Sequence, residues 1–211
     1  MVAAGCLLIG LFTGWTMMVR AVDVQPIGAN GTSVGFAAIN GWFHGMTGTH
    51  MGLYHVTDWL GLVPVTACMF FGGIGFCQLI KRKRLLCVDH DILLLGAYYA
   101  AVISGYLFFE MFPVNYRPVL IEGRLEASYP SSTTLLVLSV MPTLTFQAER
   151  RLRCVPAKSA IHILVFVFSL FMVLGRMLSG VHWLTDIVGA VFMSNGLYWV
   201  YKGLVELFDR C

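Results

Sequence analysis

The chain of 211 residues is 58% hydrophobic and only 12% charged, with a formal net charge of +3. A soluble domain usually has about a quarter of its residues charged, so this composition excludes a soluble globular domain and a disordered chain. It also excludes a disulfide-stapled secreted domain, and the scattered basic residues exclude a nucleic-acid-binding face. We therefore expect an integral membrane protein whose partners are membrane lipids and not nucleic acids.

Six apolar stretches predict the fold. A bilayer core about 30 Å thick requires roughly 20 apolar helical residues, so the expected fold class is all-α, a polytopic bundle of six transmembrane helices. The first stretch lacks the charged start and cleavage pattern of a signal peptide, so we expect a retained helix. No repeat or boundary divides the chain, and residues 1–211 are expected to form a single integral-membrane domain. The expected spans are 2–19, 60–80, 92–112, 132–147, 159–175 and 183–205.

The basic residues predict the orientation, because cytoplasmic connections are enriched in Lys and Arg. Ten of the 14 fall on one side, because they follow the second or fourth span or lie near the end of the chain. We therefore expect both termini in the cytoplasm and the first, third and fifth connections outside, in a bacterial plasma membrane. The first connection, residues 20–59, is long and aromatic, as in a segment lying along the headgroups. The ten basic residues are Lys81, Arg82, Lys83, Arg84, Arg150, Arg151, Arg153, Lys158, Lys202 and Arg210.

Polar residues on the expected outer side gather in two connections, 115–134 and 176–186. The fourth and sixth spans both begin on that side. A helix N-terminus has unpaired N–H groups and the positive end of the helix dipole, which together favour a phosphate group. The sequence therefore predicts an anion site at the outer face.

The start of the fourth span offers hydroxyl groups to such an anion. Pro130 is followed by Ser131, Ser132 and Thr133, whose side chains can bind an anion or simply cap the helix. Arg117 in the same connection is a candidate phosphate ligand, although an outer arginine can equally contact lipid headgroups.

A more specific pattern lies between the fifth and sixth spans, where Arg176, His182 and Asp186 follow one another. His182 and Asp186 are four residues apart, so the carboxylate can accept a hydrogen bond from one imidazole nitrogen and leave the other free to attack. Arg176 can bind phosphate oxygens in a bidentate manner. Ionisable residues at the mouth of a membrane bundle are costly unless they have a function, so we interpret the three as functional, with His182 and Asp186 catalytic and Arg176 phosphate-binding.

The chain resembles the type-2 phosphatidic acid phosphatase family, the membrane branch of a superfamily that includes vanadium haloperoxidases. The family motifs are K-x6-R-P, P-S-G-H and S-R-x5-H-x3-D, and the similarity extends over about residues 92–205. Gly175 and Arg176, then His182 and then Asp186, match the third motif. The resemblance implies that His182 forms a phosphohistidine, that Asp186 orients it and that Arg176 holds the phosphate.

The first motif departs from the family pattern. Arg117 and the following proline match its end, but Glu110 occupies the position of the lysine. An anion thus lies where a phosphate-binding cation is expected, and Arg124 in the same connection is a possible replacement for the missing charge.

The second motif departs as well. Pro130 and Ser131 match, whereas Ser132 replaces the glycine and Thr133 replaces the histidine that protonates the leaving group in the family. Loss of a general acid typically costs about 10²- to 10⁴-fold in rate. Candidate replacements for the acid are Glu122 or Glu126, or a histidine of the first connection, namely His44, His50 or His55. A pyrophosphate substrate, whose leaving group is less basic, would also reduce the need for an acid.

These patterns predict a membrane phosphatase that hydrolyses a lipid phosphate or a polyprenyl (isoprenoid) pyrophosphate at the outer membrane face. Two alternatives remain: a weakened or inactive relative that binds lipid phosphates, and a lipid phosphotransferase. We expect no cofactor and no metal, because no acidic spacing resembles a divalent site and arginines supply the positive charge. The sequence leaves the oligomeric state open.

Overall fold

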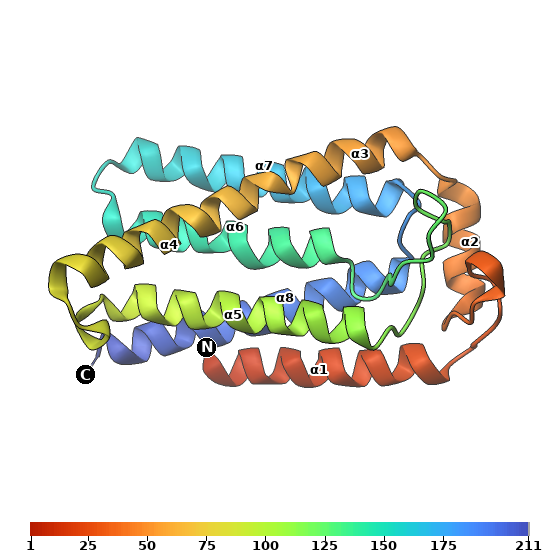
Figure 1. Ribbon diagram of the computed structural model, residues 1–211, viewed down its shortest axis with the longest axis horizontal. Coiled ribbons are helices and arrows are strands. Elements are labelled where there is room, and N and C mark those ends of the chain that lie inside the picture. The colour runs from red at the N-terminus through yellow and green to blue at the C-terminus, as the bar shows by residue number, and fades with distance from the viewer. Residues whose placement is uncertain (211) are drawn as a thin grey trace.

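The computed structural model describes residues 1–210, and Cys211 lies outside that range. Six long helices run back and forth along the longest axis of the molecule (Figure 1), without a strand among the described residues. The predicted all-helical fold is confirmed. The long helices are α1 (Val2–Ala21), α4 (Leu62–Arg82), α5 (His90–Met111), α6 (Ser132–Arg151), α7 (Val155–Leu178) and α8 (Leu184–Phe208). The short elements are the 3₁₀ turns η1 (Ala29–Gly31) and η2 (Leu85–Cys87) and the helices α2 (Ala37–Thr47) and α3 (Met51–Leu60).

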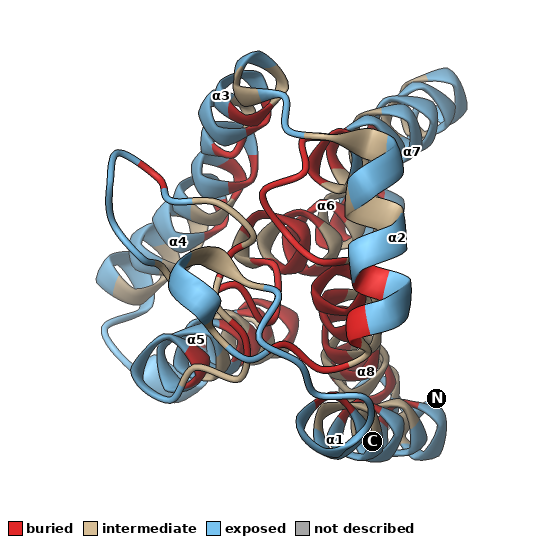
Figure 2. Ribbon diagram, turned by 90° about the vertical axis from the view of Figure 1, so that its right-hand side faces the viewer, coloured by how far each residue is buried: buried red, intermediate tan, exposed pale blue. Residues whose placement is uncertain are grey.

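Four helical segments are long and apolar enough to cross a membrane: α1, α3 together with α4, α5, and α7. Helix α6 is of similar length but lies in the middle of the bundle, in contact with α4, α5, α7 and α8 (Figure 2). Its Ser139, Thr143 and Gln147 are buried against these neighbours. A helix shielded from lipid tolerates polar side chains that find partners on adjacent helices, which explains why α6 is less apolar than the helices around it.

The second apolar stretch is longer than the sequence predicts. The helix expected to begin near residue 60 is preceded directly by α3, because Gly61 keeps helical backbone angles and the chain continues from α3 into α4. Residues 20–59 therefore supply two helices in place of a simple interfacial segment. Helix α2 lies across one end of the bundle (Figure 1), and α3 packs against α7.

Helices α1 and α8 pack very closely because glycines line their contact. A Cβ atom added at Gly5 would lie 2.7 Å from the Val200 backbone, and one added at Gly196 would lie 2.8 Å from the Ile9 side chain. Small residues allow helix backbones in a membrane to approach. This contact attaches α1 to α8, which carries part of the predicted site.

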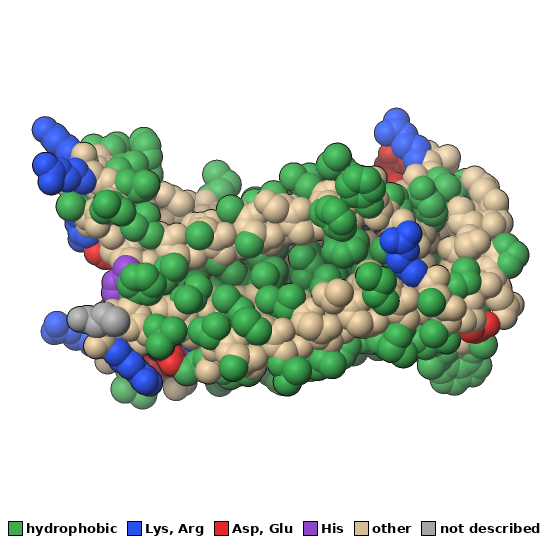
Figure 3. All heavy atoms as spheres, turned by 90° about the horizontal axis from the view of Figure 1, so that it is seen from below, with side chains coloured by type: hydrophobic (Ala, Val, Ile, Leu, Met, Phe, Trp, Pro, Cys, Tyr) green, Lys and Arg blue, Asp and Glu red, His purple; other side chains and the backbone are tan. Residues whose placement is uncertain are grey.

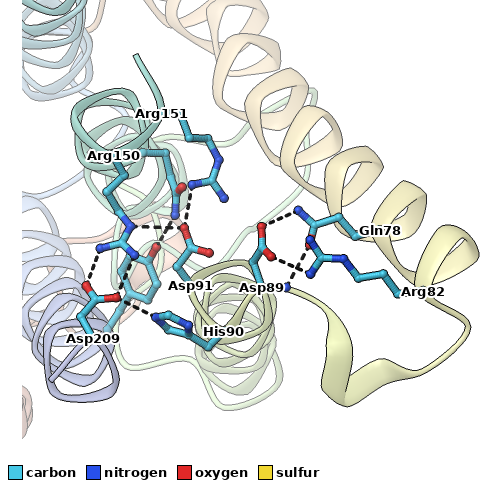
Figure 4. Close-up of polar contacts among 10 residues, drawn as sticks. Gln78, Arg82, Asp89, His90, Asp91, Arg150, Arg151 and Asp209 are labelled. Carbon is cyan, nitrogen blue, oxygen red and sulfur yellow. Dashed lines mark hydrogen bonds and ion pairs between the residues drawn. The ribbon is translucent and has the colours of Figure 1, made fainter. Parts of the chain in front are cut away.

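The surface divides into an apolar middle and two polar ends (Figure 3). Exposed apolar side chains such as Leu7, Phe108 and Leu164 cover the lengths of the helices. At the end that holds the basic residues, the buried carboxylate of Asp91 pairs with Arg150 and Arg151 (Figure 4). Arg150 also pairs with Asp209, so these ion pairs join α5, α6 and the end of α8.

Candidate active site

The N-termini of α6 and α8 meet at the other end of the bundle. The Ser131 N–H donates to the Asp186 carbonyl over 3.2 Å, which joins the two helix starts. The connection that precedes α6 lies against the same place, because the Trp183 indole N–H donates to the Tyr116 carbonyl over 2.8 Å. The two polar connections marked in the sequence therefore come together in space.

His182 lies in the turn before α8 and is buried. Its Nδ1 lies 3.0 Å from the Ser128 carbonyl and 3.2 Å from the Ser128 hydroxyl. A carbonyl only accepts hydrogen bonds, so Nδ1 must carry the proton. The lone pair is then on Nε2, which lies 3.4 Å from Nη1 of Arg117. The imidazole thus directs its unprotonated nitrogen at a guanidinium group.

The carboxylate of Asp186 is fully buried, and three other groups donate hydrogen bonds to it. They are the Asn115 amide at 3.2 Å, the Trp183 N–H at 2.9 Å and the Ser128 hydroxyl. Its Oδ2 lies 3.9 Å from Nδ1 of His182, which is too long for a hydrogen bond. The direct contact expected from the four-residue spacing is therefore replaced by a link through Ser128, because His182 precedes the helix and Asp186 caps the N–H at its start.

Arg117 is buried between His182 and the carboxylate of Glu126. Its Nε lies 3.1 Å from Oε2 of Glu126, while Nη1 approaches His182. Glu126 remains partly exposed and can move. Arg117 is thus positioned beside Nε2 of His182 and can hold a phosphate oxygen at that nitrogen.

Arg176, near the end of α7, is buried with 1% of its surface exposed. Its Nη2 donates to Thr133 and, over 2.8 Å, to Asp58 of α3. The Nε and Nη1 atoms are buried without a hydrogen-bond partner. Buried donors of a charged group nearly always have partners in folded proteins, so this guanidinium is suited to an anionic ligand.

The two arginines share an aromatic neighbour. The Tyr54 ring centroid lies 5.8 Å from Cζ of Arg117 and 4.8 Å from Cζ of Arg176. A ring face attracts cations, so Tyr54 helps hold two like charges close together. Both predicted phosphate-binding arginines therefore belong to one site.

The hydroxyl residues at the start of α6 occupy different positions. Ser131 is buried and its hydroxyl donates to Thr134 over 3.0 Å, a local contact within the helix start. Ser132 lines two cavities, and Thr133 faces Arg176. Only Thr133 of this group contacts a predicted phosphate-binding arginine.

Among the residues suggested as substitutes for the missing motif lysine and histidine, only Glu126 pairs with an arginine of the site. Glu122 and Arg124 are exposed in a turn of the connection, and His50 and His55 are exposed as well. His44 packs edge-on against Trp183, with ring centroids 5.6 Å apart. Among the described residues, none of these five side chains forms a hydrogen bond or ion pair with His182 or the two arginines, whereas Glu126 pairs with Arg117.

Glu110 lies beside the site in a polar cavity of about 210 Å³, which Arg117, Glu126 and Ser132 also line. The sequence departure at position 110 therefore places a carboxylate in the same cavity as Arg117, a predicted phosphate ligand. Within residues 1–210, no cluster of three His, Cys, Asp or Glu side chains has the arrangement of a metal site.

Burial and charge set the ionisation of His182. Desolvation, and then the positive charges of Arg117 and Arg176, lower its pKa well below the ordinary value of 6.5. Both causes disfavour the imidazolium form. The ring is consequently neutral at neutral pH, as a nucleophile must be.

The sequence patterns did not identify four residues of this arrangement: Ser128, Asn115, Asp58 and Tyr54. Ser128 and Asn115 belong to the polar connection before α6, which was the available signal. Asp58 is an acidic residue close to an apolar stretch, a position where an ionisable group is a functional candidate. Tyr54 carries no such signal.

Comparison with known proteins identifies the family of the chain and a similar fold. The family model described as the PAP2 superfamily matches residues 93–208, and no curated protein matches the chain in sequence. The fold is similar to the crystal structure of a transmembrane PAP2-type phosphatidylglycerolphosphate phosphatase from Bacillus subtilis, with a TM-score of 0.67, 16% sequence identity and 96% coverage of both chains. The family predicted from the motifs is confirmed, and the chain belongs to the PAP2 superfamily, as an integral membrane member of this phosphatase family.

Proposed function

We propose that the protein is a lipid phosphatase that hydrolyses a lipid phosphate or a polyprenyl pyrophosphate through a phosphohistidine on His182. The observation that carries this proposal is the orientation of the imidazole. The Ser128 carbonyl accepts a hydrogen bond from the Nδ1–H, and Nε2 faces Arg117 at 3.4 Å. Attack of Nε2 on phosphorus forms an N–P bond while the bond to the lipid oxygen breaks, and water then releases phosphate from the histidine.

The two arginines, Arg117 and Arg176, bind and orient the phosphate in this proposal. Their charges stabilise the extra negative charge that the equatorial oxygens develop in the transition state. Ser132 and Thr133 offer additional hydrogen-bond donors at the start of α6, where the helix dipole favours an anion. Asp186, held by Ser128 and Asn115, stabilises the positive charge that develops on the imidazole.

A lipid substrate is supported by the apolar surface next to the site. A cavity of about 310 Å³ is lined by Thr133 and Ser132 and by apolar side chains that include Val65, Ile103 and Leu136. The cavity thus connects apolar surface along the helices with a residue that contacts Arg176. A phosphate attached to an apolar chain fits such a place better than a soluble sugar phosphate.

We also propose that all six long helices cross the membrane, with both termini in the cytoplasm and the site facing outward from a bacterial plasma membrane. The basic residues at the end opposite the site support this orientation, because cytoplasmic ends are rich in Lys and Arg. Helices α6 and α8 have the length of a span and lie among apolar neighbours.

The test is release of phosphate from phosphatidic acid and from polyprenyl pyrophosphates by the detergent-solubilised protein. His182→Ala is expected to lose activity on every substrate, and the ³²P-labelled wild-type protein is expected to yield an acid-labile phosphohistidine. Equal rates for the wild type and His182→Ala would overturn the proposed mechanism.

The sequence departures favour a second candidate, a relative that binds lipid phosphates without turnover. Glu110 brings negative charge beside the phosphate site, and Thr133 is a poor proton donor at neutral pH. Binding of phosphatidic acid with no phosphate release over a long incubation would support this candidate. Trapping of a phosphohistidine at position 182 would exclude it, and analysis of the products would separate hydrolysis from transfer to another acceptor.

A further inference from the structure

The proposed phosphatase reaction requires a proton for the leaving alcohol. Alkoxide is a strong base, and a positioned acid typically contributes about 10²- to 10⁴-fold to such a step. Thr133, which faces Arg176, cannot serve as that acid at neutral pH. Thr133 occupies the motif position of the family's acid. If the site hydrolyses alcohol esters, we therefore look for another ionisable group close to Thr133.

Asp58 is the carboxylate next to Thr133. Nη2 of Arg176 donates to both Thr133 Oγ1 and Asp58 Oδ1, the latter over 2.8 Å. One guanidinium nitrogen thus brings the two side chains together, although they lie far apart in the sequence. The Asp58 side chain is 58% exposed, so it can turn from Arg176 towards a bound substrate.

Asp58 also lies at the end of the site away from the nucleophile. His182 contacts Arg117, and the Tyr54 ring lies beside both Arg117 and Arg176. Arg176 in turn pairs with Asp58. From this order of contacts we infer that a phosphate held by both arginines would lie between the imidazole and Asp58. In-line displacement places the leaving oxygen opposite the attacking atom, which is the side of Asp58.

The surroundings of Asp58 fit an apolar leaving group. Asp58 and Thr133 line the same cavity of about 310 Å³, whose other walls include Leu62, Val102 and Leu135. A lipid alcohol in this cavity would have its oxygen near the carboxyl group and its chain along the apolar walls. Glu126, by contrast, pairs with Arg117 on the side of His182.

We propose that Asp58 is the general acid of this site and acts in place of the histidine that the second motif lacks. This assignment rests on the proposed function. In the first step, Nε2 of His182 bonds to phosphorus and the P–O bond to the lipid breaks. The Asp58 carboxylate, which is ion-paired with Arg176 in the free site, takes the proton that the monoanionic phosphate ester carries and gives it to the leaving oxygen. In the second step, the Asp58 carboxylate takes a proton from water as the water oxygen bonds to phosphorus and the N–P bond breaks. Asp58 returns this proton to the departing phosphate and is again the carboxylate that pairs with Arg176.

The dependence of kcat/KM on the leaving group tests this assignment, because kcat/KM covers the steps up to the release of the alcohol. The probes are a long-chain alkyl phosphate and a 4-nitrophenyl phosphate that carries a chain of similar length. Nitrophenolate is a weak base and leaves without a proton. Asp58→Asn is expected to lower kcat/KM about 10²- to 10⁴-fold on the alkyl ester, and only a few-fold on the nitrophenyl ester.

The ratio of the two substrates is independent of how much of the variant folds, so partial misfolding does not disturb the comparison. Glu126→Gln is the matched control, since it makes the same change at the carboxylate of the other arginine, and it is expected to affect both substrates equally. An equal loss on both substrates for Asp58→Asn would mean that Asp58 only positions Arg176, and would overturn the inference, as would no loss. Failure of the proposed function is separate, because His182→Ala would then match the wild type on both substrates.

Discussion

At the scale of single residues, the central feature is that Ser128 stands between the imidazole of His182 and the carboxylate of Asp186. The Ser128 carbonyl fixes the proton of His182 on Nδ1, and its hydroxyl donates to Asp186. Asp186 therefore acts on His182 through a neighbour. A partner of this kind that fixes orientation and tautomer typically matters for catalysis although it does not touch the substrate.

Ser128→Ala is expected to lower kcat/KM roughly 10- to 100-fold, since losing a hydrogen bond to a charged group costs about 1.5–3 kcal/mol. The backbone carbonyl remains, so activity should not vanish. Phosphate release measures the effect. Ser194→Ala, which removes a buried hydroxyl that bonds the Val191 carbonyl, is the control, and an equal effect of both variants would contradict the role of Ser128.

His182 is expected to titrate below pH 6.5, because burial and two arginines lower its pKa. Between 6.5 and the lowered pKa the unfolded chain binds more protons at this residue than the folded chain, so acidification through this window reduces stability. NMR titration of isotope-labelled histidine rings measures the pKa, and the signal absent from His182→Ala identifies the residue. A midpoint at or above pH 6.5 would refute the expectation.

At the scale of the helices, burial decides which of them must be apolar. Helices α1, α5 and α7 expose much of their surface and are apolar over most of their length, whereas α6 is surrounded and carries serine, threonine and glutamine. Close helix contacts depend on small residues, and α1 meets α8 through glycines on both helices.

Gly5→Val is expected to destabilise the fold, since its side chain would overlap Val200 and the Gly196 carbonyl of α8. Overpacking of this kind costs about 1–3 kcal/mol. Gly14→Val on the same helix is the matched control, because nothing lies within 4 Å of its added Cβ. Thermal unfolding in detergent compares them, and similar losses in Tm would argue against a tight α1–α8 contact.

The contribution of the ion pairs at the end opposite the site to stability should depend on how deeply the Asp91 carboxylate is buried. Replacing both Arg150 and Arg151 by alanine leaves the buried Asp91 carboxylate without a cation, which costs about 3–5 kcal/mol for a buried pair. Asp91→Asn removes the buried charge itself and leaves two partly exposed arginines, so its loss in Tm should be smaller. The opposite order would show that Asp91 is not effectively buried in the membrane protein.

At the scale of the whole molecule, the two polar ends carry different chemistry. Arginines, hydroxyl groups and helix N-termini gather around His182 at one end, and most of the basic residues lie at the other end. Apolar side chains cover much of the surface between the ends on the face that Figure 3 shows. The six-span topology with an outward site remains a prediction.

Cysteine labelling tests that topology. Cys87 and Cys154 are exposed at the basic end, so a membrane-impermeant maleimide is expected to label them only after cells are permeabilised. Arg124→Cys places a thiol in the exposed turn near the site and should be labelled in intact cells. Peptide mass spectrometry assigns each label. Labelling of Cys154 from outside would reverse the proposed orientation.

The helix positions, the family and part of the candidate site could be predicted from composition and local sequence patterns. Helices near the six predicted positions are present because long apolar stretches in a membrane protein must satisfy their backbone groups internally. Arg176, His182 and Asp186 lie within one turn and the two helix ends beside it. Their spacing in the sequence therefore indicated the family without knowledge of the tertiary structure. Arg117 and Thr133 were identified from the short motifs that surround them.

The contacts between distant segments were decided only by the tertiary structure. Asp58 reaches Arg176 because α3 extends α4 beyond the predicted span and packs on α7. Ser128 lies between His182 and Asp186 because the starts of α6 and α8 are joined. The helices and the motif residues could be predicted from the sequence alone, since they depend on local hydrophobicity and spacing. Which side chains share one guanidinium depends on how helices pack, and no local pattern encodes that geometry.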